Sequence, residues 1–470
     1  MSSTLPHRLD VLLTRINPSF GERVRTDAEA CERVAADASG LPPGEPAAVV
    51  EPVNTEDVVL LAREAAELGV PLVPRGAGTG KAGACIPSAG QVVVDFRRLR
   101  GVRALRPRDL YAVVAPGLVT LELEQAAREV GLMYPPDPGY RHVSTIGGNI
   151  ATNAGGPRAL KYGVTQRYVW GLEVVLPGGD VVHLGRRALK GVAGYDLTSL
   201  FVGSEGTLGM VTEATMHLVP APEAVETAWI DFPDVPTAAA AAAAVLTHGG
   251  WPAMLELLDT EALNAVRPKA AALSIDATAG ASVLVEADGD ERAAHEQISR
   301  MVELFGEHGA SRARVAAGAQ EREAMRDARR MVSGALKERY PWKLSDDVVA
   351  PRSQMPELMR RARDLAATYG VRLGAYGHLG DGNLHVNFLC VDEHERQRAR
   401  TLRPEVLALA VGMGGTITGE HGVGLTKRDQ LDLEQSAELL ALQRRVKQAF
   451  DPSGILNPNK VVPSGPLSLT

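Results

Sequence analysis

Apolar and polar positions in the first part of the chain switch between strand-like runs and helix-like spacing. Residues 47–52 form a short apolar run that indicates a strand. Over residues 55–69 the apolar positions recur at helical spacing, with Thr55 as the expected N-cap and Gly69 just past the end. A strand-like run at 71–74 and a glycine-rich stretch at 75–80 come next. This order of strand, helix, strand and glycine loop predicts an α/β unit.

The pattern changes after residues 220–222, where proline punctuation predicts a domain boundary. Downstream, strand-like runs alternate with helix-like stretches, which predicts an α+β domain whose sheet is covered on one face. The helices are expected at 237–244, 290–306, 322–339 and near 431–450, and the strands at 252–259, 281–287, 374–378 and 384–388. The last two strands are joined by a short turn at 379–383, so they are expected to form a hairpin.

Length and composition limit the classes of protein that fit. With 470 residues, 45% hydrophobic and 23% charged, the chain is expected to be a soluble globular protein of two or three domains. A net charge of −7 argues against a nucleic-acid partner. The three cysteines lie far apart, which argues against a disulfide framework or an iron–sulfur cluster within the chain. Without a signal core or a membrane-length apolar run, we expect a cytoplasmic protein that reaches the inner membrane only through a partner.

Glycine clusters recur through the first half of the chain. The stretch 75–80 lacks both the P-loop ending and dinucleotide-fingerprint spacing, so alone it indicates only a tight turn. Further runs at 143–149, 151–156 and 202–209 combine glycine with serine, threonine and asparagine. Backbone amides can approach a ligand closely where no Cβ intervenes, so several such runs indicate an extended ligand threaded between loops.

Two short stretches in the second half carry candidate metal ligands. His378 and His385 flank a Gly-Asp-Gly turn, and Glu420 lies directly beside His421. A lone histidine is usually structural, but two histidines and one carboxylate form a common ligand set for a catalytic divalent ion. His421 would then be available to move a proton. Asp381 is expected to shape the turn.

The stretches 74–80, 142–149, 153–156 and 203–209 resemble the FAD domain of the vanillyl-alcohol oxidase type of flavoprotein. The second half narrows the resemblance to the FAD-linked 2-hydroxy-acid dehydrogenases: glycolate oxidase D subunit, D-lactate dehydrogenase and D-2-hydroxyglutarate dehydrogenase. The likeness covers residues 49–460. It implies an α+β protein with a two-part FAD-binding domain of the vanillyl-alcohol oxidase (PCMH) type and an α+β cap domain. The expected divisions are an N-terminal helical segment 1–45, the FAD-binding domain 46–221, the cap 222–420, and a segment 421–470 returning to the FAD domain.

The resemblance also implies roles for individual residues. Non-covalent FAD would be held by residues of the glycine loops and by one residue near the C-terminus, with Lys460 as a weaker candidate. The expected FAD-binding residues are Arg75, Gly76, Ala77, Gly78, Thr79, Gly80, Pro138, Ser144, Thr145, Gly148, Asn149, Thr152, Glu205, Gly206, Gly209, Val211 and Asn457. Zinc or a similar divalent ion would bind His378, His385 and Glu420, with His421 as the catalytic base. Arg329 would bind the substrate carboxylate, with Lys343 as a second cation.

The expected reaction is oxidation of a D-2-hydroxy acid, D-lactate or glycolate, to the 2-oxo acid, with hydride transfer to flavin N5. Alternatives are a D-2-hydroxyglutarate dehydrogenase, a flavin-binding subunit of a multi-protein glycolate oxidase complex, and a metal hydrolase, which would leave the flavin-like loops unexplained. No nicotinamide fingerprint is present. We therefore expect a separate electron acceptor, such as an electron-transfer protein, an iron–sulfur subunit or a quinone. A homodimer is compatible with this reading.

Thr79 occupies the position where relatives with a histidyl-linked flavin carry histidine. A threonine cannot form that link, so we expect heat or acid denaturation to release all of the flavin into the supernatant. The measurement is the absorbance of the supernatant and of the washed pellet. Yellow colour that stays on the denatured polypeptide would contradict the prediction.

Overall fold

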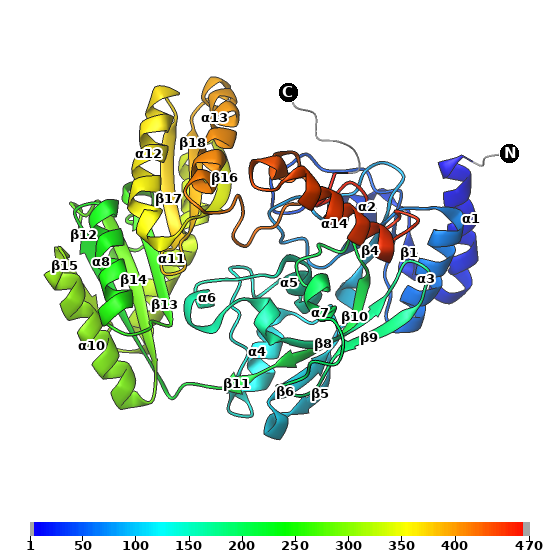
Figure 1. Cartoon of the computed structure of the whole chain (residues 1–470), viewed down its shortest axis with the longest axis horizontal. Helices are drawn as coiled ribbons and strands as arrows, with labels where there is room; N and C mark the ends of the chain where they lie inside the picture. The colour runs from blue at the N-terminus through cyan, green and yellow to red at the C-terminus, as the bar shows by residue number, and fades with distance from the viewer. Residues whose placement is uncertain (1–3, 464–470) are drawn as a thin grey trace. The chain divides into compact units, whose positions relative to one another are not determined.

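The computed structural model describes residues 4–463, and the chain divides into two compact units (Figure 1). Unit 1 contains the residues up to Gly155, then Val164–Ala221, and the residues from Glu420 onward. Unit 2 contains Gly156–Gly163 and Pro222–Gly419. The chain therefore leaves unit 1 twice and returns to it for its C-terminal segment.

Unit 1 combines short strands with helices of very different length. In chain order they are α1 Leu5–Phe20, β1 Val24–Arg25, α2 Ala28–Val34, β2 Ala48–Val50, α3 Thr55–Leu68, β3 Leu72–Arg75, β4 Val92–Asp95, β5 Val102–Arg106, β6 Tyr111–Val114, α4 Thr120–Arg128, β7 Leu132–Met133, α5 Ile146–Thr152, β8 Val169–Val175, β9 Val181–Gly185, α7 Thr198–Phe201, β10 Met210–His217, β11 Val219–Pro220 and α14 Ala437–Phe450.

The first sheet of unit 1 has the strand order β1-β2-β4-β3. Strands β2, β4 and β3 run parallel, as the predicted strand–helix–strand unit requires, and β1 is antiparallel. Strand β1 lies within the expected N-terminal helical segment, so that segment also contributes to the sheet. Helix α3 buries Val58, Leu61 and Ala65 against this sheet and α1.

The ends of α3 show where local prediction succeeds and fails. Gly69 takes φ 62° at the C-terminus, as expected of a left-handed cap. The N-cap prediction was wrong by one residue: the side chain of Asn54, not Thr55, accepts the hydrogen bond from the Asp57 amide. The Thr55 hydroxyl instead donates to Glu173 on β8, 2.7 Å away. A tertiary partner therefore decided between two adjacent residues that can both cap a helix.

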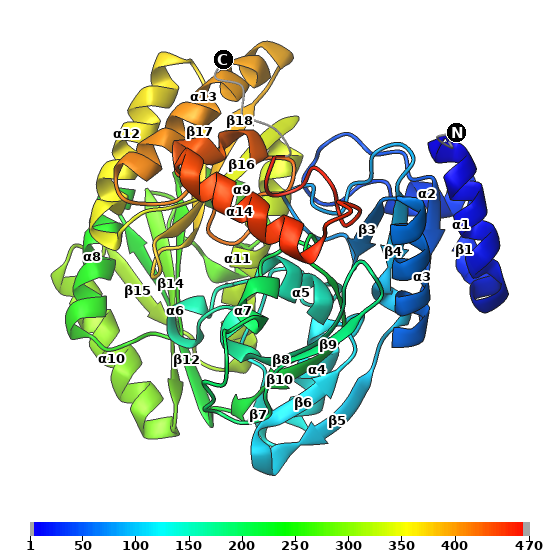
Figure 2. The same ribbon diagram turned by 45° about the vertical axis from the view of Figure 1, so that its right-hand side comes forward.

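The second sheet of unit 1 is antiparallel, with the strand order β5-β6-β10-β8-β9. The C-terminal segment packs onto this unit, where Phe450 of α14 meets Phe201 of α7 edge-on at 5.3 Å, and Leu456 forms a parallel bridge with Leu72. The red α14 is visible beside α5 and α7 in Figures 1 and 2. The helix expected near 431–450 is in fact a 3-10 turn at Arg428–Leu433 followed by α14.

Unit 2 is built on long strands and amphipathic helices. Its elements are α6 Ala159–Tyr162, β12 Ala224–Phe232, α8 Val235–His248, β13 Met254–Asp259, α9 Thr260–Val266, β14 Ala281–Gly289, α10 Glu291–Glu307, β15 Arg312–Val315, α11 Ala319–Arg339, β16 Trp342–Val349, α12 Met355–Thr368, β17 Arg372–His378, β18 Asn383–Cys390 and α13 Glu393–Gly412. Every strand pair in its seven-stranded sheet is antiparallel, and the order is β15-β12-β14-β13-β17-β18-β16. The predicted hairpin at the two histidines is confirmed.

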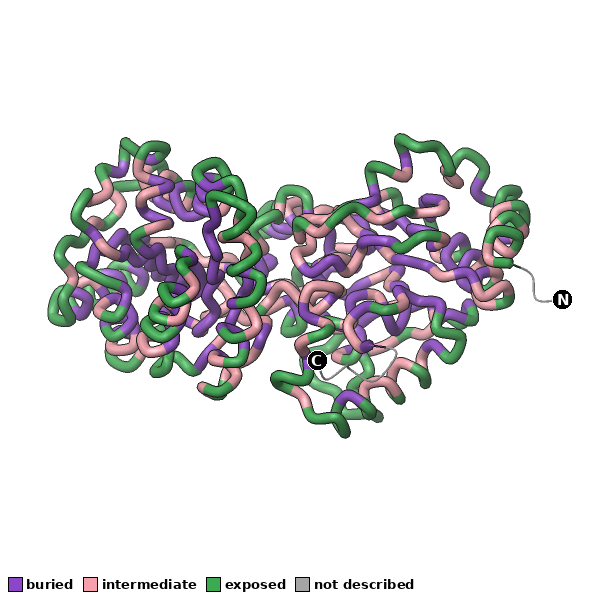
Figure 3. Tube along the Cα trace, turned by 90° about the horizontal axis from the view of Figure 1, so that it is seen from above, coloured by how far each residue is buried: buried purple, intermediate pink, exposed green. Residues whose placement is uncertain are grey.

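The expectation that this sheet is covered on one face was wrong. On β12, Trp229 belongs to a core cluster with residues of α9 and α11, whereas the Phe232 ring packs edge-on against Phe305 of α10. Residues three apart on a strand point to opposite faces, so helices cover both. This explains why residues 281–288 of β14 are all buried. Figure 3 shows the same trend along the chain, with buried stretches mostly inside the trace and exposed stretches mostly on its outside. A strand covered on both faces loses the alternating pattern from which its orientation could have been predicted.

Within residues 4–463, no helix combines the length and the apolar character that a transmembrane span requires.

Candidate functional site

The two predicted histidine ligands lie on neighbouring strands of the unit 2 sheet. His378 ends β17 and His385 lies near the start of β18. In the strand register His385 is opposite Tyr376, while His378 is opposite Asn383. The tight turn between the strands depends partly on Asp381, whose side chain accepts a hydrogen bond from the Asn383 amide at 3.1 Å. The hairpin thus holds both imidazoles on one short element.

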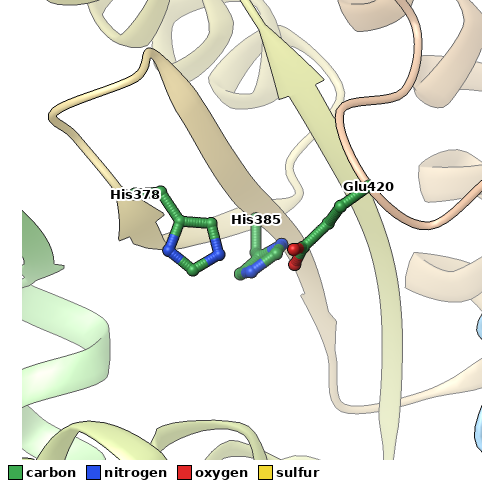
Figure 4. Close-up of side chains that lie close together, drawn as sticks. All are labelled: His378, His385 and Glu420. Atoms are coloured by element: carbon green, nitrogen blue, oxygen red, sulfur yellow. The ribbon is translucent and has the colours of Figure 1, made fainter. Parts of the chain in front are cut away.

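The structure brings together His378, His385 and Glu420, whose ligand atoms all lie within 4.8 Å of one another. The two imidazole rings are 5.3 Å apart between centroids and nearly perpendicular. Figure 4 shows the Glu420 carboxylate reaching toward the His385 ring, with the His378 ring beside it. Two nitrogens and one carboxylate oxygen at this spacing fit a divalent metal ion such as zinc and leave a coordination position open.

Behind His378 lies a buried carboxylate that the sequence analysis did not single out. Glu256 on β13 is completely buried and lies opposite His378 in the sheet register. Its Oε1 accepts a hydrogen bond from His378 Nδ1 at 2.5 Å. Donation by Nδ1–H fixes the tautomer in which the lone pair lies on Nε2, so Nε2 is the nitrogen that could bind a metal.

Glu256 remains ionised because the Arg329 cation and the hydrogen bond from His378 stabilise its charge. Burial alone would raise its pKa, but Arg329 and His378 lower the pKa of Glu256 to about 2. Arg329 Nε donates to Glu256 Oε2 at 2.6 Å, and its guanidinium is itself almost fully buried. An ionised carboxylate behind a metal-binding imidazole increases the basicity of that ligand.

A second buried carboxylate fixes the chain just before Glu420. Asp347 on β16 is fully buried and accepts a hydrogen bond from the Gly419 amide at 2.8 Å. Its Oδ1 also accepts from the Thr418 hydroxyl at 3.2 Å. These contacts set the backbone from which Glu420 projects. His421, the predicted base, follows immediately and is half-buried.

The two predicted substrate-binding cations both lie close to one aromatic ring, that of Tyr376. The Arg329 guanidinium carbon is 4.9 Å from the centroid of Tyr376, and Lys343 Nζ is 5.9 Å from it. Lys343 Nζ also donates to Ser333 Oγ at 2.9 Å, one turn along α11 from Arg329. Arg329 therefore has a structural partner, Glu256, on one edge of its guanidinium.

In unit 1 the expected FAD-binding segments converge from distant parts of the sequence. A Cβ added at Gly76 would lie 2.4 Å from Thr145 Oγ1, so the 75–80 loop contacts the start of α5. Thr145 caps α5 by accepting from the Gly148 amide. The Glu205 amide donates to the Ala151 carbonyl at 2.8 Å. The Asn457 side chain donates to the Glu205 carbonyl at 2.7 Å.

Other expected FAD-binding residues are tied to the protein itself. Arg75 is buried and donates to the Ala36 carbonyl at 2.8 Å, and its guanidinium lies directly under Gly78. Asn149 Nδ2 donates to Thr120 Oγ1, which is 2.9 Å from Ser144 Oγ. Four more expected residues make hydrogen bonds within the protein: Thr152 donates to the Gly148 carbonyl, the Pro138 carbonyl accepts from the Arg141 amide, the Gly80 carbonyl accepts from the Ala38 amide, and Lys460 donates to the carbonyls of Gly83 and Ile86. The other three are placed by packing or strand pairing: Gly206 lies against Pro74, Gly209 lies against Val174, and Val211 pairs with Val174.

Comparison of the chain with known proteins identifies its family. Residues 46–185 match the FAD binding domain profile, and residues 221–461 match the profile of the FAD linked oxidases, C-terminal domain. The chain is 39% identical over 420 residues to glycolate oxidase subunit GlcD of Bacillus subtilis, covering 88% of this chain and 89% of that protein. It is 34% identical to a D-lactate dehydrogenase of Anaerostipes hadrus, covering 88% and 89%. This chain is a member of the FAD-linked oxidase family.

The fold of this FAD-linked oxidase also has a solved counterpart. A crystal structure of p-cresol methylhydroxylase with substrate bound matches with a TM-score of 0.83 at 16% identity, covering 97% of both chains. At that identity the likeness concerns the fold alone. The predicted α+β fold of the vanillyl-alcohol oxidase type is thus confirmed, and the protein is an FAD-linked oxidoreductase.

Whether the residues of this FAD-linked oxidase fit the cofactor can be judged from two buried oxygen atoms. Within residues 4–463, Glu205 Oε2 and Asn457 Oδ1 are buried without a hydrogen-bond donor. FAD carries N–H and hydroxyl donors that can satisfy such acceptors. In the same range the amides of Ala77, Gly78 and Thr79 donate to no other residue, so the 75–80 loop can accept an anion. The residues fit FAD.

Glu256 and Asp347 were missed by sequence reasoning, although Glu256 left a signal. It is the one charged residue among Met254, Leu255, Leu257 and Leu258, all of which are buried. A charge inside a buried apolar strand requires a compensating partner, so it marks a candidate site. The identity of that partner could not be read from the sequence.

Replacing Glu256 with glutamine should weaken divalent metal binding by about 10- to 100-fold, because the charge behind His378 is lost. Zinc affinity can be measured by competition with a chromophoric chelator. Glu286→Gln is the matched control, since Glu286 is buried in the same sheet and paired with an arginine of α11, Arg326, but contacts neither histidine. Equal zinc affinity of the Glu256→Gln variant and the wild type would contradict the assigned role.

Proposed function

We propose that the protein oxidises a D-2-hydroxy acid, D-lactate or glycolate, to the corresponding 2-oxo acid, with a divalent metal and FAD as cofactors. The observation that carries the proposal is that the ligand atoms of His378, His385 and Glu420 lie within 4.8 Å of one another. In addition, Glu256 is hydrogen-bonded both to His378 and to Arg329. The names of the relatives, a glycolate oxidase subunit and a D-lactate dehydrogenase, support the same substrate class.

In this reaction different residues of the chain would bind the metal, bind the substrate and move the proton. His378 Nε2, His385 and Glu420 would hold the metal, whose Lewis acidity lowers the pKa of a hydroxyl that it binds. Arg329 would bind the substrate carboxylate through guanidinium donors not used by Glu256. His421, adjacent to Glu420, would take the hydroxyl proton.

The redox chemistry, acceptance of the C2 hydrogen as hydride, belongs to the bound flavin. The oxidation removes one proton and one hydride from the hydroxy acid and leaves the 2-oxo acid, so a further acceptor must reoxidise the flavin. The name of the Bacillus subtilis relative contains the word subunit, which supports an electron-accepting partner for this chain.

The proposal is tested by anaerobic mixing of the FAD-loaded protein with D-lactate, glycolate, D-2-hydroxyglutarate and L-lactate. We expect D-lactate or glycolate to bleach the visible flavin absorbance, and L-lactate to leave it unchanged. A chelator, or the substitution His385→Ala, should abolish the bleaching while FAD stays bound. If no 2-hydroxy acid reduces the flavin, the substrate class is wrong. If reduction survives both chelation and His385→Ala, the metal has no part in it.

Arg329→Ala should raise the KM for the hydroxy acid by about 10- to 100-fold, because a charge-assisted hydrogen bond to a carboxylate is worth about 1.5–3 kcal/mol. Lys343→Ala should raise KM less. Since Arg329 also neutralises Glu256, KM is compared on metal-saturated protein whose metal content has been measured.

Arg326→Ala is the matched control for Arg329→Ala. Arg326 lies one turn earlier on α11 and pairs with Glu286 as Arg329 pairs with Glu256. A KM effect of Lys343→Ala larger than that of Arg329→Ala would reverse the assignment of the two cations.

A further inference from the structure

The segment that follows Glu420 and His421 is held by a carboxylate in unit 1. Glu205 Oε1 accepts hydrogen bonds from the Val423 amide at 2.7 Å and the Gly424 amide at 3.3 Å. A Cβ added at Gly422, which has φ +85°, would lie 2.8 Å from the same oxygen. One carboxylate oxygen therefore fixes the backbone two to four residues beyond Glu420, which is one to three residues beyond the predicted base, His421.

Glu205 itself is held in an unusual conformation. It takes φ +51°, in the left-handed region that favours glycine, and is only 5% exposed. Its amide donates to the Ala151 carbonyl, and its own carbonyl accepts from Asn457 Nδ2. Residues held in this backbone region persist where surrounding contacts determine them, and such positions cluster at ligand sites. The conformation directs the carboxylate toward residues 422–424.

The second carboxylate oxygen has no protein donor. Glu205 Oε2 and the nearby Asn457 Oδ1 are both buried acceptors without a partner among residues 4–463. Burial raises the pKa of Glu205 to about 7, although the amides of Val423 and Gly424 lower it. A buried acceptor without a donor is costly, and two of them on hydrogen-bonded residues indicate a ligand that donates to both. FAD, the cofactor of this family, offers such donors through its ring N–H and its hydroxyl groups.

We infer that Glu205 is a positioning residue that couples FAD binding to the order of the segment carrying Glu420 and His421. One oxygen holds the amides of Val423 and Gly424, and the other accepts a hydrogen bond from FAD. Bound FAD thereby strengthens divalent metal binding, and bound metal strengthens FAD binding to the same degree, because linkage is reciprocal. This inference rests on the metal centre proposed above.

The first test does not depend on the metal. Hydrogen exchange of the backbone amides is followed by mass spectrometry on the full-length apoprotein and on the protein reconstituted with FAD. In the wild type, the peptide containing Val423 and Gly424 should exchange about tenfold more slowly with FAD bound. In Glu205→Gln the side-chain NH₂ cannot accept the donor from FAD, so this protection should be lost. Equal exchange of that peptide in wild-type apoprotein and holoprotein would overturn the inference without any variant.

The second test measures the coupling itself. Zinc affinity is determined by chelator competition on apoprotein and on FAD-loaded protein, and the ratio of the two dissociation constants is the readout. We expect a ratio of about ten in the wild type, within the usual range of coupling, and a ratio of about one in Glu205→Gln. Asp95→Asn is the control, because Asp95 is equally buried in unit 1 but pairs with Arg97. It should retain the wild-type ratio.

The outcomes separate this inference from the proposed function. If zinc binds and hydroxy acids bleach the flavin but the wild-type ratio is one, only the coupling is wrong. If zinc binds in neither state, the metal centre and the coupling fail together. If Glu205→Gln does not fold, Glu205→Asp replaces it. The shorter side chain cannot reach both the amides and FAD, so the ratio should again fall toward one, and a ratio of ten would overturn the role of Glu205.

Discussion

The candidate metal site depends on the charge of a single buried carboxylate, Glu256. It lies in an apolar strand with no exposed surface, and an ionised group in such a place is costly unless it is paired and hydrogen-bonded. Arg329 and His378 meet that requirement from the adjacent helix and the adjacent strand. The same contacts orient the His378 imidazole. The pairing that makes the charge tolerable therefore also orients a candidate metal ligand.

The rest of the unit 2 sheet extends this arrangement across neighbouring strands. Strands β13, β17, β18 and β16 are adjacent in that order and contribute Glu256, His378, His385 and Asp347. Antiparallel pairing places opposite residues a few ångströms apart, so ligands and their supporting carboxylates share one rigid surface. These four side chains are buried, so the electrostatic contacts that they make are strong.

In unit 1 the candidate cofactor-binding loops are irregular, and polar side chains rather than strand pairing hold them together. Glu205 and Asn457 both have positive φ, and the Asn457 amide bridges Ala84 and Glu205. The C-terminal segment thus links loops that are far apart in the sequence. Glycines at these points allow backbone to approach backbone, and the buried acceptors left over are those a nucleotide cofactor can satisfy.

The sequence alone determined the elements with strong local periodicity, including α3, α10, α11 and the β17–β18 hairpin, as well as the chemical types of the candidate ligands. Local pattern suffices there because helix spacing, turn residues and residue chemistry are written in consecutive positions. The tertiary structure decided the N-cap of α3, the covering of both faces of the unit 2 sheet, and the partners of Glu256, Asp347 and Glu205. Glu256 and His378 are 122 positions apart. Their pairing follows from strand order and register, which arise when the whole sheet packs and which no local stretch encodes.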